Sequence, residues 1–190
     1  MHIKERHPHS RKNPMMPKDP AAEIKPATTL ELCAMFGPYA RVLPPLFDYT
    51  AAKTFVGPAS ILKVSGGRER LNLALLKHCA DHVVIIDGRH LAPFGIVGPT
   101  EVASAVTGKC RALLVFGSVF DVGKLAKEKI LPVHALDNGP HVLRDEGGKV
   151  EAAYLDCAAG LITHDFYITG DADGIVAVRQ EQMQAHFPVR

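Results

Sequence analysis

Two kinds of apolar pattern alternate through the middle of the chain. The runs VVII (residues 83–86) and ALLVF (residues 112–116) are continuous, and a glycine follows each of them closely. Such runs are typical of strands buried on both faces of a sheet. Helical spacing of apolar residues predicts three helices, at Leu71–Cys79, Glu101–Val106 and Val122–Lys129. Two further strands are predicted at Phe55–Val64 and Pro132–Ala135. This alternation predicts a layered α/β domain.

The two flanks of this region follow other patterns. A helix is predicted to start at Thr28 or Thr29 and to stop at Gly37-Pro38, with an apolar stripe formed by Leu30, Cys33, Ala34 and Phe36. Pro44-Pro45 interrupts the following segment, so Arg41–Phe47 is predicted to be an extended connector. The last third is predicted to contain strands separated by glycine-rich turns, at Lys149–Ala159, Leu161–Ile168 and Gly174–Val178. A final helix is predicted at 179–187.

Charge and composition narrow the classes of function. The 190 residues carry 22 basic and 20 acidic side chains, a net charge of +2. This gives no strong overall attraction to nucleic acid or to an anionic membrane, and we expect binding to neither. No apolar run approaches the roughly 20 residues that span a bilayer, and the N-terminus lacks the apolar region of a secretory signal. A cytoplasmic location is therefore expected.

Residues 1–27 differ from the rest of the chain. They contain five prolines, and six basic residues against three acidic ones. A segment with few large apolar residues cannot offset the entropy lost on ordering. We predict a mobile basic arm at 1–27 and a single α/β domain at 28–190.

Several side chains with chemical potential have a common structural interpretation. The cysteines lack a CxxC pair and are predicted to be buried reduced thiols: Cys33, Cys79, Cys110 and Cys157. Four histidines at loops or strand ends are either general acids and bases or, as is more common, surface or hydrogen-bonded structural residues: His90, His134, His141 and His164. Asp171 and Asp173 lack the rest of a calcium loop and are predicted to form a turn.

Three loops at strand ends or helix starts are candidates for a ligand site. They are Asp87–His90, Gly98–Glu101 and Gly117–Asp121. Loops at the carboxyl ends of strands commonly bind ligands in α/β sheets. The free N–H groups of the helix that starts near Gly98 would suit a carboxylate or phosphate. Asp121 either holds a cation or caps the following helix, and the two roles are compatible.

The order and spacing of these segments resemble one superfamily. It contains the regulator of ribonuclease activity A and the 4-hydroxy-4-methyl-2-oxoglutarate aldolases. The resemblance spans roughly residues 28–182 and rests on these segments: TLELCAMF at 29–36, LPPLF at 43–47, VVIIDG at 83–88, GPTEVASA at 98–105, ALLVFGSVFDV at 112–122 and GDADGIVAV at 170–178. The resemblance implies an α/β/β/α sandwich like a swivelling phosphohistidine domain. It also implies a homotrimer or hexamer with active sites between subunits.

The resemblance also implies roles for particular residues. In the aldolases, backbone N–H groups of a Gly-Glu-Leu-Leu-like loop bind the pyruvyl carboxylate, and that loop corresponds to Gly98, Pro99, Thr100 and Glu101. An Asp-Gly-x-x-Arg-Asp motif follows, whose Arg binds substrate and whose last Asp holds a divalent cation. It corresponds to residues 116–121. Asp121 is thus the implied catalytic residue and ligand of Mg²⁺ or Mn²⁺, and Phe120 stands at the substrate-binding position.

Three departures from the aldolase pattern weaken this site. Phe116 replaces an acid, and Phe120 replaces the arginine, whose charge and paired N–H groups a phenyl ring cannot supply. Pro99 removes one N–H group from the anion-binding loop. Arg68, Arg70 and Arg89 are candidates to replace the lost charge, if the fold brings one of them close.

Two main functions follow, and the sequence favours the first narrowly. The first is a metal-dependent lyase acting on small 2-oxo acids, by retro-aldol cleavage or oxaloacetate decarboxylation through a pyruvate enolate. The second is a non-catalytic regulator that binds and inhibits a ribonuclease. Asp121 and the motif spacing favour the lyase, whereas the aromatic residue before Gly117 and the PLF sequence at 45–47 resemble the regulators. RNA binding through the arm is a weak third possibility, because the arm has no aromatic residue for base stacking.

Overall fold

The computed structural model describes residues 27–144 and 147–187. Most of the predicted basic arm therefore lies outside the described residues. Within them, no helix is long and apolar enough to cross a bilayer.

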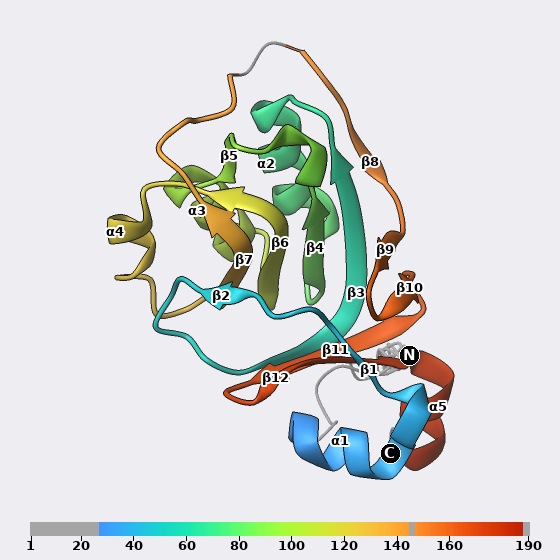
Figure 1. Ribbon diagram of the computed structural model, residues 1–190. Coiled ribbons are helices and arrows are strands. Elements are labelled where there is room, and N and C mark those ends of the chain that lie inside the picture. The colour runs from blue at the N-terminus through green and yellow to red at the C-terminus, as the bar shows by residue number, and fades with distance from the viewer. Residues whose placement is uncertain (1–26, 145–146, 188–190) are drawn as a thin grey trace, which may run out of the picture.

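A ten-stranded sheet forms the centre of the domain (Figure 1). Its main path runs β1-β12-β11-β3-β4-β6-β7-β2, while β5 pairs with β6 and β8 pairs with β3. The strands are β1 (Arg41–Val42), β2 (Phe47–Asp48), β3 (Phe55–Val64), β4 (Val83–Asp87), β5 (Gly95–Val97), β6 (Ala112–Val119), β7 (Val133–Asn138), β8 (Val150–Ala152), β11 (Phe166–Asp171) and β12 (Gly174–Arg179). A separate hairpin joins β9 (Leu155–Cys157) to β10 (Gly160–Ile162).

The long strand β3 lets the sheet curl over itself. Its first half, Phe55–Pro58, pairs antiparallel with β11, and its second half, Ala59–Lys63, pairs parallel with β4. The β11–β12 ribbon therefore crosses below the parallel strands in Figure 1. An apolar core fills the space between these two parts of the sheet, with Phe116, Phe166 and Ile168 among its buried side chains.

Helices cover the two outer faces. The helices α2 (Arg68–His78) and α3 (Pro99–Thr107) pack on the parallel strands. The helices α1 (Thr29–Phe36) and α5 (Gln180–His186) pack on β12. Three short helices complete the fold: η2 (Gly37–Tyr39), η3 (Arg89–Leu91) and α4 (Val122–Leu125). The layers thus run helix, sheet, sheet, helix, as the predicted α/β/β/α sandwich requires.

Most predicted elements are confirmed, but the face that α1 buries matches the predicted stripe only at Phe36 and, in part, at Cys33. Thr28 caps α1 as expected: its Oγ1 accepts the N–H of Glu31, whose carboxylate accepts the N–H of Thr28. However, Leu30 is 70% exposed, and Leu32 and Phe36 are buried. The reason is that Thr29 donates two hydrogen bonds to the Asp171 carboxylate, which turns the Thr29 side of the helix inward.

Several boundaries were also wrong. Gly117 does not end the second buried strand, because β6 continues to Val119 beside the unpredicted strand β5. The helix predicted at Val122–Lys129 ends at Leu125, because the next N–H groups, of Lys127 and Glu128, bond to carbonyls three and not four residues back. In the last third, two of the predicted strands are each divided in two, into β8 with β9 and β10 with β11.

Candidate functional site

The predicted loops gather at one end of the parallel strands. Asp87 at the end of β4 lies in register with Phe116 of β6, and Gly95 of β5 lies beside Ser118. The backbone N–H of Phe120 donates to the carbonyl of Val97 at 3.0 Å, which joins the end of β6 to the start of α3. The fold therefore brings Phe120 to the start of the 98–101 segment, as the resemblance implies.

The carboxylate of Glu101 occupies the start of α3. Its side chain is fully buried, and its Oε2 accepts the N–H of Gly98 at 2.9 Å. Its Oε1 accepts hydrogen bonds from Arg68 Nε at 3.1 Å and Nη2 at 2.8 Å, and from the Asn72 amide at 3.2 Å. A helix N-terminus favours negative charge, and here an internal carboxylate supplies it. The N–H of Gly98 is consequently not free for a substrate.

The ring of Phe120 covers the same place. A Cβ atom added to Gly98 would lie 2.3 Å from Phe120 Cζ, so the ring sits directly against the glycine backbone. On this ring lies the guanidinium of Arg68, whose Cζ is 4.9 Å from the ring centroid. Gly98, the phenyl ring, the arginine and Glu101 thus form one packed cluster, called here the α3 cluster. Of the three arginines considered from the sequence, Arg68 is the one that reaches this site.

The other two arginines have different partners. Arg89 binds the Asp87 carboxylate through Nε at 2.9 Å and Nη2 at 2.8 Å. Burial alone would raise the pKa of Asp87, but the hydrogen bonds from Arg89 outweigh it and hold this pKa below its usual value. Arg70 donates to the carbonyl of Gly148 at 2.8 Å. Phe116, at the position of the family's acid, is 1% exposed within the inner core.

Asp121 does not act as the predicted helix cap. It stands at the N-cap position of α4 with a left-handed backbone (φ 55°), but its side chain makes no capping bond. Instead, its Oδ2 lies 2.6 Å from Nζ of Lys124. Among the described residues, no group of three or more His, Cys, Asp or Glu side chains is arranged to hold a metal ion. One carboxylate paired with an ammonium group fits Mg²⁺ or Mn²⁺ poorly, and the divalent cation stays a prediction.

Pro99 and Thr100 lie on the first turn of α3. Pro99 is partly buried and Thr100 is exposed. The first N–H groups of a helix have no partner within the helix, and the first one bonded within α3 is that of Val102, to the carbonyl of Gly98. Because Pro99 has no N–H, Thr100 and Glu101 supply the backbone donors of this turn. With Pro99 at its first position and the N–H of Gly98 bonded to Glu101, this turn is a smaller anion site than the loop implied by the resemblance.

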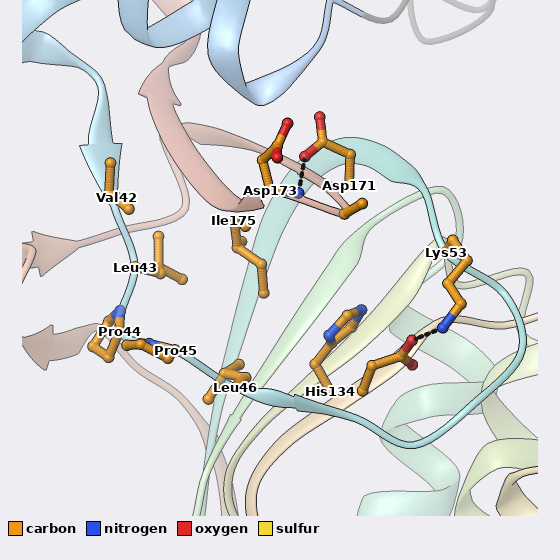
Figure 2. Close-up of a pocket in the computed structure, with 13 residues that line it drawn as sticks. Val42, Leu43, Pro44, Pro45, Leu46, Lys53, His134, Asp171, Asp173 and Ile175 are labelled. Carbon is orange, nitrogen blue, oxygen red and sulfur yellow. Dashed lines mark hydrogen bonds and ion pairs between the residues drawn. The ribbon is translucent and has the colours of Figure 1, made fainter.

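The sequence did not reveal a second polar site, around His134 on β7. This residue lines a cavity of about 490 Å³ beside the connector 42–46 (Figure 2). Its side chain is buried, and its Nε2 is without a hydrogen-bond partner among the described residues. The prediction of a surface or hydrogen-bonded histidine was therefore wrong here. The other wall residues come from distant parts of the chain, so spacing alone gave no signal for this cavity.

The cysteine prediction is confirmed in part. All four cysteines are free thiols, with Cys79 and Cys110 buried and Cys33 and Cys157 partly exposed. The Asp171-Asp173 turn is confirmed, since Asp171 Oδ1 accepts the N–H of Asp173 at 3.0 Å.

Comparisons with known proteins agree with the architecture. A family model described as RraA-like, Aldolase/RraA, matches residues 29–177. A protein of Burkholderia pseudomallei (strain K96243), provisionally named a 4-hydroxy-4-methyl-2-oxoglutarate aldolase, is 29% identical over 137 residues, which cover 72% of this chain and 82% of that protein.

Two solved structures share the fold. The RNA-processing inhibitor RraA from Thermus thermophilis superposes with a TM-score of 0.69 at 21% identity, covering 80% of this chain and 92% of that one. RraAS2 of Streptomyces coelicolor, described as an unusual member of the RNase ES inhibitor RraA protein family, gives 0.70 at 19% identity, covering 94% of this chain and 91% of that one. At these identities the two structures support the fold alone.

Proposed function

This chain belongs to the RraA-like family (Aldolase/RraA). We propose that it is a non-catalytic binding protein, like the regulators of this family. The observation that carries the proposal is the packed α3 cluster. In the aldolases, the resemblance implies that this position binds the carboxylate of the substrate. In this chain the Phe120 ring packs against Gly98, and the N–H group of Gly98 donates to the Glu101 carboxylate. The position is filled by the protein itself.

The charges of the cluster oppose an incoming 2-oxo acid. A substrate carboxylate at the start of α3 would have to displace the phenyl ring and then meet the buried negative charge of Glu101. The positive charge of Arg68 is already used by that carboxylate, through two hydrogen bonds to Oε1. Like charges brought together away from water repel strongly. The arrangement therefore disfavours binding of the substrate class expected from the sequence.

A lyase acting on small 2-oxo acids is the second candidate, favoured by one observation. Arg68 lies on the ring that replaces the family's arginine, with Cζ 4.9 Å from the ring centroid. If the Phe120 ring turned away, this guanidinium would be the group that binds a substrate carboxylate, with the N–H of Thr100 beside it. The relatives provisionally named as aldolases agree with this alternative.

A ribonuclease is the proposed partner, because the two structural relatives are named as an RNA-processing inhibitor and as a member of an RNase inhibitor family. The test has two arms. In the first, an E-type ribonuclease is incubated with the purified chain, and we expect capture at micromolar concentration and slower RNA cleavage. Absence of capture would remove the ribonuclease from the proposal. Analytical ultracentrifugation of the same sample tests the predicted trimer or hexamer.

The second arm measures pyruvate release from oxaloacetate with Mg²⁺. We expect no release above the uncatalysed rate in the wild type or in Asp121→Ala. Release by the wild type that Asp121→Ala abolishes, and that Asp156→Asn on the exposed hairpin strand β9 retains, would establish the lyase and overturn the non-catalytic assignment.

A further inference from the structure

Two buried cysteines meet where α2 and α3 end. Cys79 directly follows α2, and Cys110 comes three residues after the end of α3. The segments that contain them run side by side, since the N–H of Asp81 donates to the carbonyl of Lys109 at 2.9 Å. Cys110 Sγ lies 3.7 Å from the carbonyl oxygen of Leu75, which is one helical turn before Cys79. These contacts place the sulfur of Cys110 against the last turn of α2.

The two thiols also act on each other. Both belong to the buried apolar cluster beneath α2 and α3. A hydrogen bond from the Cys110 thiol holds the pKa of Cys79 below its usual value, although burial opposes this. The same contact raises the pKa of Cys110. Because the thiolate is the reactive form of cysteine, the pair consists of a nucleophile, Cys79, and a protonated thiol beside it.

Cys110 gives the pair an opening to solvent. It is 8% exposed, whereas Cys79 is fully buried. Cys110 lines a cavity of about 410 Å³, together with the apolar side chains of Val106, Leu131 and Pro132. Hydrogen peroxide is little larger than water, so the cavity lets this oxidant approach the pair from the Cys110 side. A bulky thiol reagent has no comparable path.

We propose that Cys79 and Cys110 are a redox-active pair that hydrogen peroxide converts to a disulfide bond. The Cys79 thiolate attacks one oxygen of the peroxide, the O–O bond breaks, and hydroxide leaves. The Cys110 thiol then attacks the sulfenic sulfur of Cys79, so that the S–S bond forms, the S–O bond breaks, and water leaves. The two thiols lose two electrons and two protons, and the peroxide becomes two molecules of water. This pair is independent of the function proposed for the α3 cluster.

The disulfide joins the ends of the two helices whose first turns hold the Arg68–Glu101 ion pair. A disulfide stabilises a fold mainly by restricting the unfolded chain, and the effect grows with the length of the loop that it closes. The loop from 79 to 110 is long in this sense. Oxidation should therefore raise the midpoint of thermal unfolding by at least about 4 °C, and reduction with dithiothreitol should reverse the change.

The test treats the full chain with a small excess of hydrogen peroxide and maps its disulfides by mass spectrometry without reduction. We expect the peptides of Cys79 and Cys110 to be linked, with the loss of two hydrogen atoms, and to separate on reduction. The partly exposed thiols of Cys33 and Cys157 are the internal comparison. A map in which Cys79 and Cys110 remain thiols, or in which either is linked to Cys33, to Cys157 or to a second chain, would overturn the proposal.

Three variants separate this pair from the other cysteines. Cys79→Ala and Cys110→Ala should each abolish the rise in the thermal midpoint, while Cys33→Ala should retain it. In Cys110→Ala the sulfenic acid has no thiol to react with, so dimedone should label Cys79. The circular dichroism spectrum shows that each variant is folded, and the wild-type map decides the question if one is not. A rise that persists in Cys79→Ala or Cys110→Ala would refute the assignment.

Discussion

Replacing Glu101 by Gln tests how tightly the α3 cluster is held. The carboxylate accepts four hydrogen bonds, three at Oε1 and one at Oε2, at 2.8–3.2 Å. Glutamine keeps one oxygen, so its NH₂ group must face either the N–H of Gly98 or the donors of Arg68 and Asn72. Two donors then face each other in either orientation, and the negative charge that balances Arg68 is lost.

The expected cost follows from these contacts. A hydrogen bond to a charged group contributes about 1.5–3 kcal/mol, and breaking a fully buried ion pair costs about 3–5 kcal/mol. The side chain of Arg68 is 23% exposed, so water recovers part of that loss. We therefore expect Glu101→Gln to lower the free energy of unfolding by about 2–3 kcal/mol. The midpoint of thermal unfolding should fall by roughly 4–12 °C.

Urea unfolding followed by circular dichroism at neutral pH measures this change. Glu151→Gln is the matched control, because that side chain is 63% exposed and surface changes alter stability by less than about 0.5 kcal/mol. In the double variant Arg68→Met with Glu101→Gln, the two losses should be less than additive by about 1 kcal/mol or more. A loss below about 0.5 kcal/mol for Glu101→Gln alone would refute the description of a closed cluster.

Three further changes test other parts of the structure by unfolding measurements. Gly98→Ala should lower the free energy of unfolding by about 1–3 kcal/mol, because its Cβ would lie 2.3 Å from Phe120 Cζ. Adding Phe120→Ala to the same chain should remove most of that penalty. Equal penalties with and without the Phe120 ring would show that the ring is elsewhere. Thr28→Ala should lower the free energy of unfolding by about 1 kcal/mol by deleting the acceptor for the N–H of Glu31, and an unchanged calorimetric midpoint would contradict this capping role. Burial lowers the pKa of His134 in the fold, with Asp48 opposing it only in part, so the unfolded chain binds this proton first and stability should be lost as pH falls below about 6.5. His134→Phe should flatten this pH dependence, and equal slopes for the two proteins would exclude His134 as its source.

The strands that the sequence predicted best are those fixed by local pattern. The segments Phe55–Val64 and Val83–Ile86 were placed correctly because long β-branched runs have few alternatives in a buried sheet. Gly117 was misleading, since glycine commonly ends a strand. Here it lies inside β6, where an added Cβ would lie 3.4 Å from the carbonyl oxygen of Gly88. The tighter contact of that Cβ would be with Cδ1 of Ile96, at 3.1 Å, so packing against the Ile96 side chain, and not a turn, favours glycine here.

The candidate site was predictable in position but not in content. Motif order placed Gly98–Glu101 next to Phe120-Asp121. Phe120 does lie against Gly98, whereas the Asp121 carboxylate pairs with Lys124. The contact of Arg68 with Glu101 could not be predicted from the sequence. Arg68 lies at the start of α2, and only the packing of α2 on α3 brings its guanidinium to Glu101. The cavity at His134 was missed for the same reason: its walls are the connector 42–46 and the turn 171–175, which are far apart in the sequence.

Phe120, Arg68 and Glu101 are best understood as one connected change from the aldolase pattern. An arginine at position 120 would bring a second positive charge close to Arg68, whereas a phenyl ring offers its face to that guanidinium and its edge to the glycine backbone. With the ring in place, Arg68 has Glu101 as its acceptor, and the carboxylate in turn takes the N–H of Gly98. Each contact leaves less room for an external anion, so restoring the arginine alone would leave Glu101 still occupying the start of α3.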